Sequence, residues 1–446
     1  MSSMIAVILG AECNVVNEVR KLIMDTCGAD LFQAGELATA TVTHLRERRQ
    51  DEAANDGGPA ALRRFSMREL GAFLGVAHST ISRSMPEEDR QTEGAGRLYR
   101  YSFRHLIEAR ERHGRTKYRP EGEKRVRVAI NNLKGGVSKS TLCTHLAVRL
   151  VLSGYRVLVL DLDPQATAST QLGLMPDYGI DEDETLIPFL DGKFSEEAGG
   201  GPCTSMHYAI KHTDIPNLDA IPASMALAGA DMVVPARQMR DRDKGYRYWR
   251  ALDEGLRAVE DEYDVVLMDC PPSLSFLAAM AARAATCLLV PLRSSMPDFA
   301  SSAQFHKMFG RLNEDLDYRE AEDQAVSRGV ELDELTDEEL DAHTKRWAWS
   351  KMVITQKKAQ AAEEQMEHFI RGAYPNRVLT NRFMHSPAVQ AAGNCMRTLY
   401  DISRQRLDSR QLDKAVTSLD LLCEEITGLI ESARMWVNQQ LLSEEA

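Results

Sequence analysis

The chain has 446 residues, of which 43% are hydrophobic and 27% are charged, and its formal net charge at pH 7 is −12. This composition is ordinary for a globular protein and excludes a fibrous or largely disordered chain, while the length favours two or three domains over one core. No apolar run approaches the roughly 20 residues that span a bilayer, so no membrane partner is expected.

The eight cysteines are scattered without a C-x-x-C pair. This pattern predicts reduced thiols in a cytoplasmic protein rather than disulfides or a zinc site. Cys143 and Cys270 lie beside the motifs described below, and we interpret them as small apolar residues in buried elements rather than nucleophiles. The N-terminal segment 1–16 is apolar but has no basic leader, which favours a short helix over a signal peptide.

Charge is unevenly distributed along the chain. Residues 61–125 carry 15 Lys or Arg and 9 Asp or Glu, whereas residues 314–341 carry 13 acidic and 2 basic side chains. A face that binds phosphates needs only local positive charge, so the negative total does not exclude nucleic acid. The acidic segment would repel DNA, and we interpret it as an insertion near 314–342 that forms a solvated helical protrusion.

Four regions follow one another in the sequence. Residues 1–60 have helical spacing of apolar side chains and are interpreted as a helical, dimerisation-capable segment. Residues 61–123 form a basic module, and the linker TKYRPEGEKR leads from it into the largest region, residues 124–400. Residues 401–446 are predicted to be helical. In that last region one apolar face is formed by Leu412, Ala415, Leu419, Leu422 and Ile426.

The basic module has the pattern helix, tight turn at Gly75, helix. Arginine and tyrosine then alternate in GRLYRYSFRHLIEAR, which predicts a short hairpin followed by a helix. This arrangement resembles a winged helix-turn-helix of the MerR-like kind, although the same spacing occurs in ordinary helical hairpins. The residues expected to meet DNA are His78, Ser79, Thr80, Ser82, Arg83, Arg97 and Arg100.

From residue 124 onward, short β-branched runs alternate with helical stretches. Most of the runs are apolar throughout, which is typical of parallel strands covered on both faces. The region is therefore predicted to be an α/β, doubly wound, mostly parallel sheet. The predicted strands are residues 125–131, 156–163, 218–223, 264–270, 286–292, 351–356 and 377–381.

The segment NNLKGGVSKST, residues 131–141, lies between the first of these strands and a helical pattern. Strand, glycine loop and helix in this order predict a phosphate-binding loop that takes ATP or ADP with Mg²⁺. Lys139 is expected to reach the terminal phosphates and the Ser140 hydroxyl to bind Mg²⁺. The predicted nucleotide-binding residues are Gly135, Gly136, Val137, Ser138, Lys139, Ser140 and Thr141.

Three carboxylates follow the next two strands. Asp161 and Asp163 end the strand at 156–163, and Asp269 ends the strand at 264–270. The carboxyl ends of parallel strands meet at one edge of the sheet, so we expect all three near the phosphate loop. One of Asp161 and Asp163 is expected to order a metal-bound water, and the other is expected to position the attacking water. Asp163 and Asp269 are the carboxylates predicted for the metal site.

The loop, written K-G-G-x-x-K-[ST], resembles the deviant Walker A motif of partition and septum-site ATPases. The sequence DPQ and the basic module make the resemblance strongest to ParA-type plasmid partition ATPases with an N-terminal DNA-binding domain. Within them, the C-terminal stretch FMHSPAVQAAGNCMRTLYDIS resembles the corresponding segment of RepA of repABC-type replicons. The family resemblance implies that Lys134 reaches the partner's nucleotide across a dimer, that Asp163 has the main hydrolytic role, and that Asp269 is the Walker B residue. Ser138 departs from the pattern, which usually has glycine there.

The resemblance further implies an ATP-dependent homodimer that binds DNA non-specifically on the nucleoid. It also implies a ParB-like partner that stimulates hydrolysis of ATP to Mg-ADP and phosphate. A further implied role is repression of the protein's own operon at operator DNA. The segment FMHSPAVQAAGNCMRTLYDIS is similar to the region that supports non-specific DNA binding in this family. The basic residues carried over are Arg382 and Arg397; both are equally compatible with surface ion pairs.

Of three other functions, one remains open and two are disfavoured. A regulator in which nucleotide only tunes DNA affinity, with incidental hydrolysis, would have the same motifs. A septum-site ATPase of the MinD sort would need a basic amphipathic C-terminal helix, whereas the tail WVNQQLLSEEA is acidic. A nitrogenase-type iron protein would need cluster cysteines, which the scattered pattern does not favour.

Overall fold

The computed structural model describes residues 35–40, 62–84, 91–93, 98–176, 179–403 and 408–444. The chain divides into two units, residues 1–61 and 62–446. In the first unit only the helical residues 35–40 are described, so the predicted N-terminal dimerisation segment falls outside the described residues. None of the helices in the described ranges is both long and apolar enough to cross a membrane.

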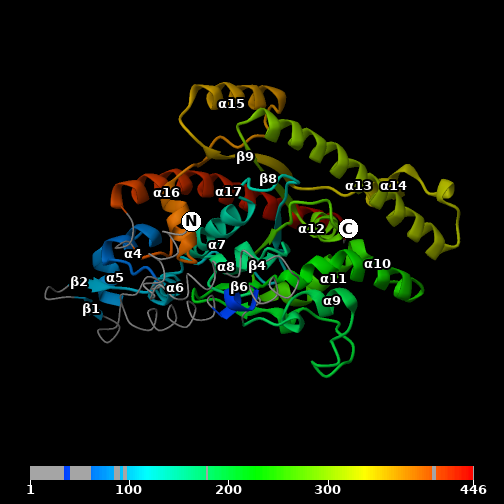
Figure 1. Ribbon diagram of the computed structural model, residues 1–446, viewed down its shortest axis with the longest axis horizontal. Coiled ribbons are helices and arrows are strands. Elements are labelled where there is room, and N and C mark those ends of the chain that lie inside the picture. Colours follow the sequence, from blue (N-terminus) through cyan, green and yellow to red (C-terminus); the bar gives the residue numbers. More distant parts are fainter. Residues whose placement is uncertain are drawn as a thin grey trace. The chain divides into compact units, whose positions relative to one another are not determined.

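The second unit begins with two helices, a two-stranded antiparallel hairpin and a third helix (Figure 1). The first helix starts at a reciprocal cap, in which the Ser66 hydroxyl accepts from the Glu69 N–H group and the Glu69 carboxylate accepts from the Ser66 N–H group. It ends at Gly75, whose φ of 67° is the left-handed conformation that glycine adopts without strain. These elements are α4 (Met67–Leu74), α5 (His78–Ser84), β1 (Gln91–Glu93), β2 (Leu98–Arg100) and α6 (Phe103–Arg112).

An eight-stranded sheet follows, with strand order β10-β9-β8-β3-β7-β4-β6-β5. All pairs are parallel except β5 with β6, so the predicted mostly parallel sheet is confirmed. The strands are β3 (Val126–Ile130), β4 (Val157–Asp161), β5 (Lys211–His212), β6 (Leu218–Ile221), β7 (Val265–Asp269), β8 (Cys287–Arg293), β9 (Trp349–Lys357) and β10 (Phe383–Met384).

The last predicted strand is wrong in position. Within residues 377–381 only Val378 forms a bridge, to Met352, and the edge strand β10 begins at Phe383 instead. Asn376, immediately before this segment, has a φ of 61°, the left-handed conformation of a turn rather than of a strand. A β-branched run of five residues indicates strand propensity, but propensity does not place the turn that precedes it.

Helices cover both faces of the sheet (Figure 1). Strand residues alternate between two hydrophobic cores: Val128 and Leu267 pack into one, and Ala129 and Met268 into the other. The first core contains α7 (Lys139–Ser153), α16 (Pro387–Asn394) and α17 (Ser409–Glu444). The second contains α9 (Ile187–Asp191), α10 (Ala230–Asp241), α11 (Tyr248–Val259), α12 (Phe276–Ala284), α13 (Met296–Arg328) and α15 (Ala361–Ala373).

The remaining elements are short. They are α8 (Thr167–Gln171), α14 (Asp337–Ala342) and the 3₁₀ turns η2 (Glu182–Glu184), η3 (His207–Ala209), η4 (Met225–Gly229), η5 (Arg242–Lys244), η6 (Glu260–Glu262) and η7 (Leu332–Glu334). The five apolar positions predicted for the C-terminal helix are all buried in α17.

The helix-turn-helix unit shares a core with the sheet. Phe65, Leu70 and Leu106 belong to the same buried cluster as α7 and α17. The predicted linker between the two regions is bound near both ends: the Lys117 N–H group donates to the Gly154 carbonyl at 2.8 Å, and the Lys124 N–H group donates to the side chain of Asn438 at 3.0 Å. Residues 62–446 therefore form one compact unit in which this linker is a fixed connection.

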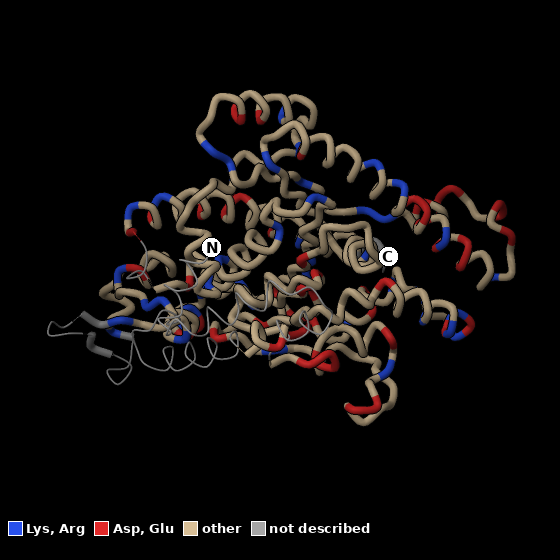
Figure 2. The backbone as a smooth tube through the Cα atoms, in the orientation of Figure 1, with Lys and Arg blue, Asp and Glu red and all other residues tan. Residues whose placement is uncertain are grey.

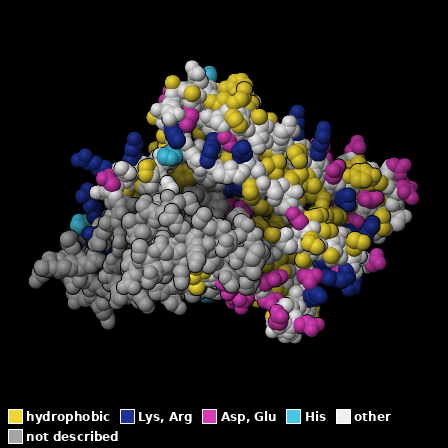
Figure 3. Space-filling view, viewed as in Figure 1, with side chains coloured by type: hydrophobic (Ala, Val, Ile, Leu, Met, Phe, Trp, Pro, Cys, Tyr) yellow, Lys and Arg dark blue, Asp and Glu magenta, His cyan; other side chains and the backbone are white. Residues whose placement is uncertain are grey.

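The acidic segment is helical, but its boundaries differ from the predicted insertion. Helix α13 is continuous from Met296 and reaches into the segment, which α14 completes. Acidic residues gather at the end of α13 and around α14 (Figures 2 and 3). One face of α13 is not solvated, because it is joined to α11 and its neighbours by ion pairs; these are Arg247–Asp323, Arg250–Glu320 and Arg283–Asp317.

Candidate functional site

The loop between β3 and α7 presents free backbone donors. The N–H groups of residues 135–138 donate no hydrogen bond within the described part of the chain. Gly136 has a φ of 72° and Ser138 a φ of 66°, with Val137 between them at negative φ, and such alternation of left-handed with ordinary residues turns N–H groups toward a common centre. Helix α7 then begins at Lys139 and adds the positive end of its dipole. Such a concavity binds anions.

Lys139 lies inside this loop. Its side chain is 5% exposed, and its ammonium group donates to the Lys134 carbonyl at 3.3 Å, which places it across the mouth of the loop. Burial lowers the pKa of Lys139, while the nearby carboxylates of Asp269 and Asp163 oppose that shift. A phosphate group can replace the carbonyl as the partner of this ammonium group.

Asp269 is a buried carboxylate without a protein partner. It ends β7, it is fully buried, and neither of its oxygens accepts a hydrogen bond from the described residues. Burial raises its pKa well above the ordinary value, the charge of Asp161 adds to this, and Ser140 and Lys139 counteract part of the shift. The neighbouring side-chain amide of Asn131 is also buried with no partner among those residues.

Asp161 and Asp163 have different surroundings. Asp161 pairs in register with Asp269, and its carboxylate accepts from the Ser169 N–H group at 2.8 Å and the Ser169 hydroxyl at 2.7 Å. Burial raises the pKa of Asp161 to about 6. Asp163 accepts from the Gln165 N–H group at 3.0 Å and is 8% exposed. The bonds of Asp161 anchor α8, whereas Asp163 lies closer to the solvent side of the loop.

Lys134, the first lysine of the loop, differs from Lys139. Its N–H group donates to the side chain of Asn132 at 3.1 Å, and its side chain is half-buried. Its ammonium group has neither a hydrogen bond nor an ion pair with any of the described residues. The structure therefore leaves this cation available to a ligand or to another chain.

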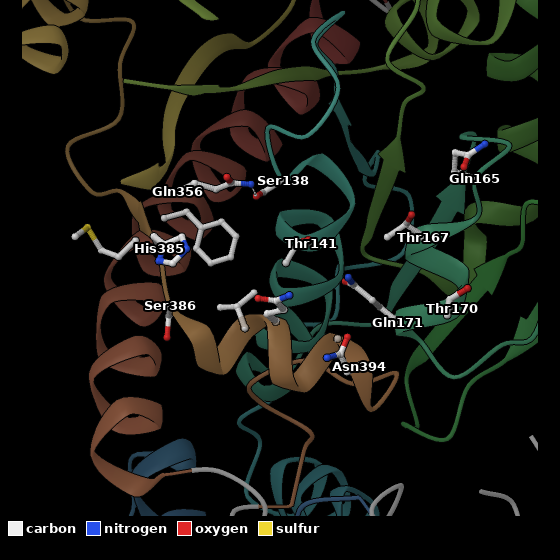
Figure 4. Close-up of a pocket in the computed structure, with 15 residues that line it drawn as sticks. Ser138, Thr141, Gln165, Thr167, Thr170, Gln171, Gln356, His385, Ser386 and Asn394 are labelled. Atoms are coloured by element: carbon white, nitrogen blue, oxygen red, sulfur yellow. Dashed lines mark hydrogen bonds between the residues drawn. The ribbon is translucent and has the colours of Figure 1, made fainter. Parts of the chain in front are cut away.

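A pocket of about 510 Å³ opens beside the loop (Figure 4). Ser138 and Thr141 line its loop side, and the opposite side comes from β9, β10 and α16. The lining residues that sequence reasoning missed are Gln165, Thr167, Thr170, Gln171, Gln356, Phe383, Met384, His385, Ser386, Val389, Gln390, Gly393 and Asn394. Gln356 could have been found, because it lies near the carboxyl end of a parallel strand, where ligands of such sheets bind.

The residues present fit a magnesium ion beside a polyphosphate. The described residues contain no group of three or more His, Cys, Asp or Glu side chains that would hold a metal by themselves. Mg²⁺ instead takes one or two protein oxygens and completes its shell with phosphate oxygens and water. The buried carboxylate of Asp269 and the Ser140 hydroxyl, which lowers the pKa of that carboxylate, supply that donor set.

The predicted DNA-binding residues lie in two places. On α5 the side chains of His78, Ser79, Thr80, Ser82 and Arg83 are all exposed, while Ile81 between them is buried. Arg100, at the end of β2, is half-buried, and Arg97 lies outside the described residues. The exposed face of α5 is thus a polar surface with one cation near its end.

The two C-terminal arginines are engaged in ion pairs. Arg397 is 5% exposed and its guanidinium contacts Asp214 at 2.8 Å and Asp401 at 3.8 Å, which favours the ion-pair alternative for this residue over a DNA contact. Arg382 is 43% exposed and contacts the buried carboxylate of Glu367 at 2.6 Å. The guanidinium of Arg382 is therefore paired with that carboxylate, but its side chain remains accessible to solvent.

Comparisons with known proteins match the fold and the loop. A family model described as an AAA domain matches residues 125–319. A putative replication protein A of Sinorhizobium fredii is 30% identical over 386 residues, which cover 83% of this chain and 87% of that protein. SopA of Escherichia coli K12 is 30% identical over 278 residues, which cover 59% of this chain and 68% of the SopA chain. A solved partition protein shares the fold, with a TM-score of 0.58 over 91% of this chain and 99% of that one, at 18% identity.

Proposed function

Since this chain belongs to the family of ParA-type partition ATPases, in the group related to RepA, we propose that it segregates a replicon. In this proposal the hydrolysis of ATP to ADP and phosphate controls whether the protein binds DNA. The observation that carries the proposal is the loop itself: free N–H groups, a buried Lys139 and the unpartnered Asp269 meet at one edge of the sheet.

Each residue has a distinct part in the proposed reaction. The N–H groups of residues 135–138 bind the phosphates, Lys139 neutralises their terminal charge, and Thr141 contacts the first phosphate. Asp269 and Ser140 hold Mg²⁺, which, when bound, neutralises charge on the outer phosphates. Asp163 orients the water whose oxygen bonds to the terminal phosphorus as the bond to ADP breaks. We assign Asp161 to positioning, because its carboxylate already accepts three hydrogen bonds.

The pocket beside the loop is proposed to hold the ribose and the adenine base. Its volume of about 510 Å³ lies in the range of small-molecule sites, and Thr141 borders both the pocket and the loop. Polar side chains such as Gln390 and Asn394 line it together with the apolar Phe383 and Val389, which suits a flat base with polar edges.

Lys134 makes ATP a ligand for assembly. Its ammonium group has no partner among the described residues, so a second subunit's nucleotide can supply one. We propose that the ATP-bound dimer binds chromosomal DNA through many weak phosphate contacts, that a ParB-like protein stimulates hydrolysis, and that α5 also binds operator DNA. The protein would then act on the nucleoid in the cytoplasm.

Sedimentation of the protein with ATP, ADP or no nucleotide, with and without non-specific DNA, tests this function. We expect a dimer and DNA retention with ATP alone. Lys134→Ala should bind nucleotide and remain a monomer. Absence of an ATP-dependent dimer and of DNA retention in the wild-type protein would overturn the proposal.

A second candidate function, that of a DNA-binding regulator, is supported by the core that the helix-turn-helix unit shares with α7. In this alternative, nucleotide only tunes operator binding and hydrolysis is incidental. Plasmid retention in cells that carry Asp163→Ala separates the two functions. Loss of the plasmid supports the partition ATPase, and normal segregation supports the regulator.

A further inference from the structure

Three side chains from the neighbouring strands hold the carbonyl groups of the phosphate loop. The Gly136 carbonyl accepts from the guanidinium of Arg293 at 2.6 Å and from the side-chain amide of Gln356 at 3.0 Å. The Val137 carbonyl lies 2.9 Å from the hydroxyl of Thr355. All three side chains come from the carboxyl ends of β8 and β9, so they contact the loop from the same side.

These bonds determine where the loop's donors point. In a trans peptide the C=O group of one residue and the N–H group of the next point in opposite directions. With the carbonyls of Gly136 and Val137 directed at β8 and β9, the N–H groups of Val137 and Ser138 point away from these strands. Those two N–H groups are among the donors that have no protein partner in the described part of the chain.

Gln356 is held in an unusual conformation to make its bonds. Its φ is 51°, a left-handed value that costs a non-glycine residue about 1–2 kcal/mol. Its amide also donates to the Ser138 hydroxyl at 2.7 Å, and the side chain lines the pocket beside the loop (Figure 4). Backbone strain of this kind persists where the surrounding structure requires it.

Arg293 adds a charge that no acid neutralises. It forms no ion pair with the described residues, and its Nε–H group is buried without a partner among them. The guanidinium therefore lies against the outer side of the loop as a cation, and among the described residues the Gly136 carbonyl is its hydrogen-bond partner. A cation in that position favours an anion on the inner side.

We propose that Arg293 and Gln356 are positioning residues for the nucleotide, which keep the loop's carbonyl groups turned away from the phosphates and its N–H groups turned toward them. This inference rests on the proposed function, because it concerns the same site. The two residues act through the loop backbone and need not contact the phosphates. Without them, the Gly136 carbonyl is free to rotate toward the bound anion and repel it.

The test compares ADP with AMP by calorimetric titration of the full chain. The variants are Arg293→Met and Gln356→Met, and the matched controls are Arg311→Met and Gln360→Met, which are exposed and outside the site. We expect the affinity for ADP to fall about tenfold in both site variants, or about 1.4 kcal/mol. For AMP, which lacks the second phosphate, we expect little change in Arg293→Met and a smaller loss than for ADP in Gln356→Met, whose side chain also lines the pocket. Arg293→Lys should restore part of the ADP affinity, because it retains a charged donor.

The outcomes are distinguishable. Site variants that bind ADP within twofold of the wild-type protein overturn this inference and leave the proposed function intact. An equal loss for ADP and AMP also overturns it, because a general defect of the pocket or of folding lowers both affinities together. If the wild-type protein binds no ADP, the proposed function fails as well.

Discussion

The guanidinium group of Arg110 donates to the backbone carbonyl of Leu152, in the last turn of the helix that begins in the phosphate loop. The same side chain donates to the carbonyls of Arg115 at 2.9 Å and Phe73 at 2.7 Å. Arg110 is 6% exposed and lies on α6. One buried cation thus joins α4 of the helix-turn-helix unit to the end of α7.

Replacing Arg110 by methionine should lower the free energy of unfolding by about 2–3 kcal/mol, since buried carbonyl groups lose their donors. Denaturant unfolding measures this change. Arg115→Met is the matched control, because that side chain is exposed and makes no described bond; it should change stability by less than about 0.5 kcal/mol. Equal effects of the two substitutions would contradict the assigned role of Arg110.

His145 should make stability depend on pH. Burial lowers the pKa of His145 to about 4 from its ordinary 6.5, and its Nε2 accepts from the Leu399 N–H group, so the folded protein holds it neutral. The unfolded chain binds a proton below pH 6.5 and the folded one does not. The contribution is therefore fully present above pH 6.5 and is lost as pH falls toward 4, by up to about 1.4 kcal/mol per pH unit.

Comparing wild-type and His145→Gln unfolding between pH 7 and pH 4 isolates this contribution. The wild-type protein should lose stability over that range more steeply than the variant, since glutamine has no proton to bind. Parallel pH profiles would show that His145 is not the titrating group.

Asp269→Asn should separate stability from function. The buried carboxylate raises the energy of the folded protein at pH 7, so its neutral amide analogue should increase the free energy of unfolding by about 1–3 kcal/mol. The same substitution removes the charge of the proposed Mg²⁺ ligand and should abolish the proposed Mg²⁺-dependent ATP hydrolysis. Asp163→Asn is the control: that carboxylate accepts a backbone hydrogen bond, so no gain in stability is expected. A less stable Asp269→Asn protein would contradict the prediction.

Arg83→Gln should weaken DNA binding in a salt-dependent manner. If the exposed side chain of Arg83 contacts one phosphate, the slope of log affinity against log salt should decrease in magnitude by about 1. Fluorescence anisotropy with duplex DNA at several salt concentrations measures the slope. Arg311→Gln changes the total charge equally, and an identical slope change in that control would exclude a contact at α5.

Arg397→Met should destabilise the fold. Removing one partner of a buried ion pair leaves the carboxylate of Asp401 without its cation, which costs about 3–5 kcal/mol. Thermal unfolding measures this loss. A variant of wild-type stability with selectively reduced DNA binding would instead restore Arg397 to the DNA-binding surface.

The predicted strands were largely correct because a parallel sheet buried on both faces leaves a continuous apolar signal. The loop at 131–141 could also be recognised, since glycine, lysine and serine at fixed spacing follow the requirements of a phosphate group. In contrast, the strand at 377–381 was misplaced, and the ion-pair partners of Arg397 could not be identified. Local sequence cannot show which acid an arginine will meet, or that a turn at Asn376 leaves Val378 with only a single bridge.

The sequence by itself determined the strands of the sheet, the phosphate loop and the three carboxylates at the strand ends. The patterns that indicate these features each lie within one strand, turn or helix. Only the tertiary structure decided what completes them. Gln356 lies 220 positions along the chain from Gly136, and their bond exists because β9 packs next to β8 and β8 next to β3. Arg110 and Leu152 meet for a similar reason, since a shared core brings α6 against α7.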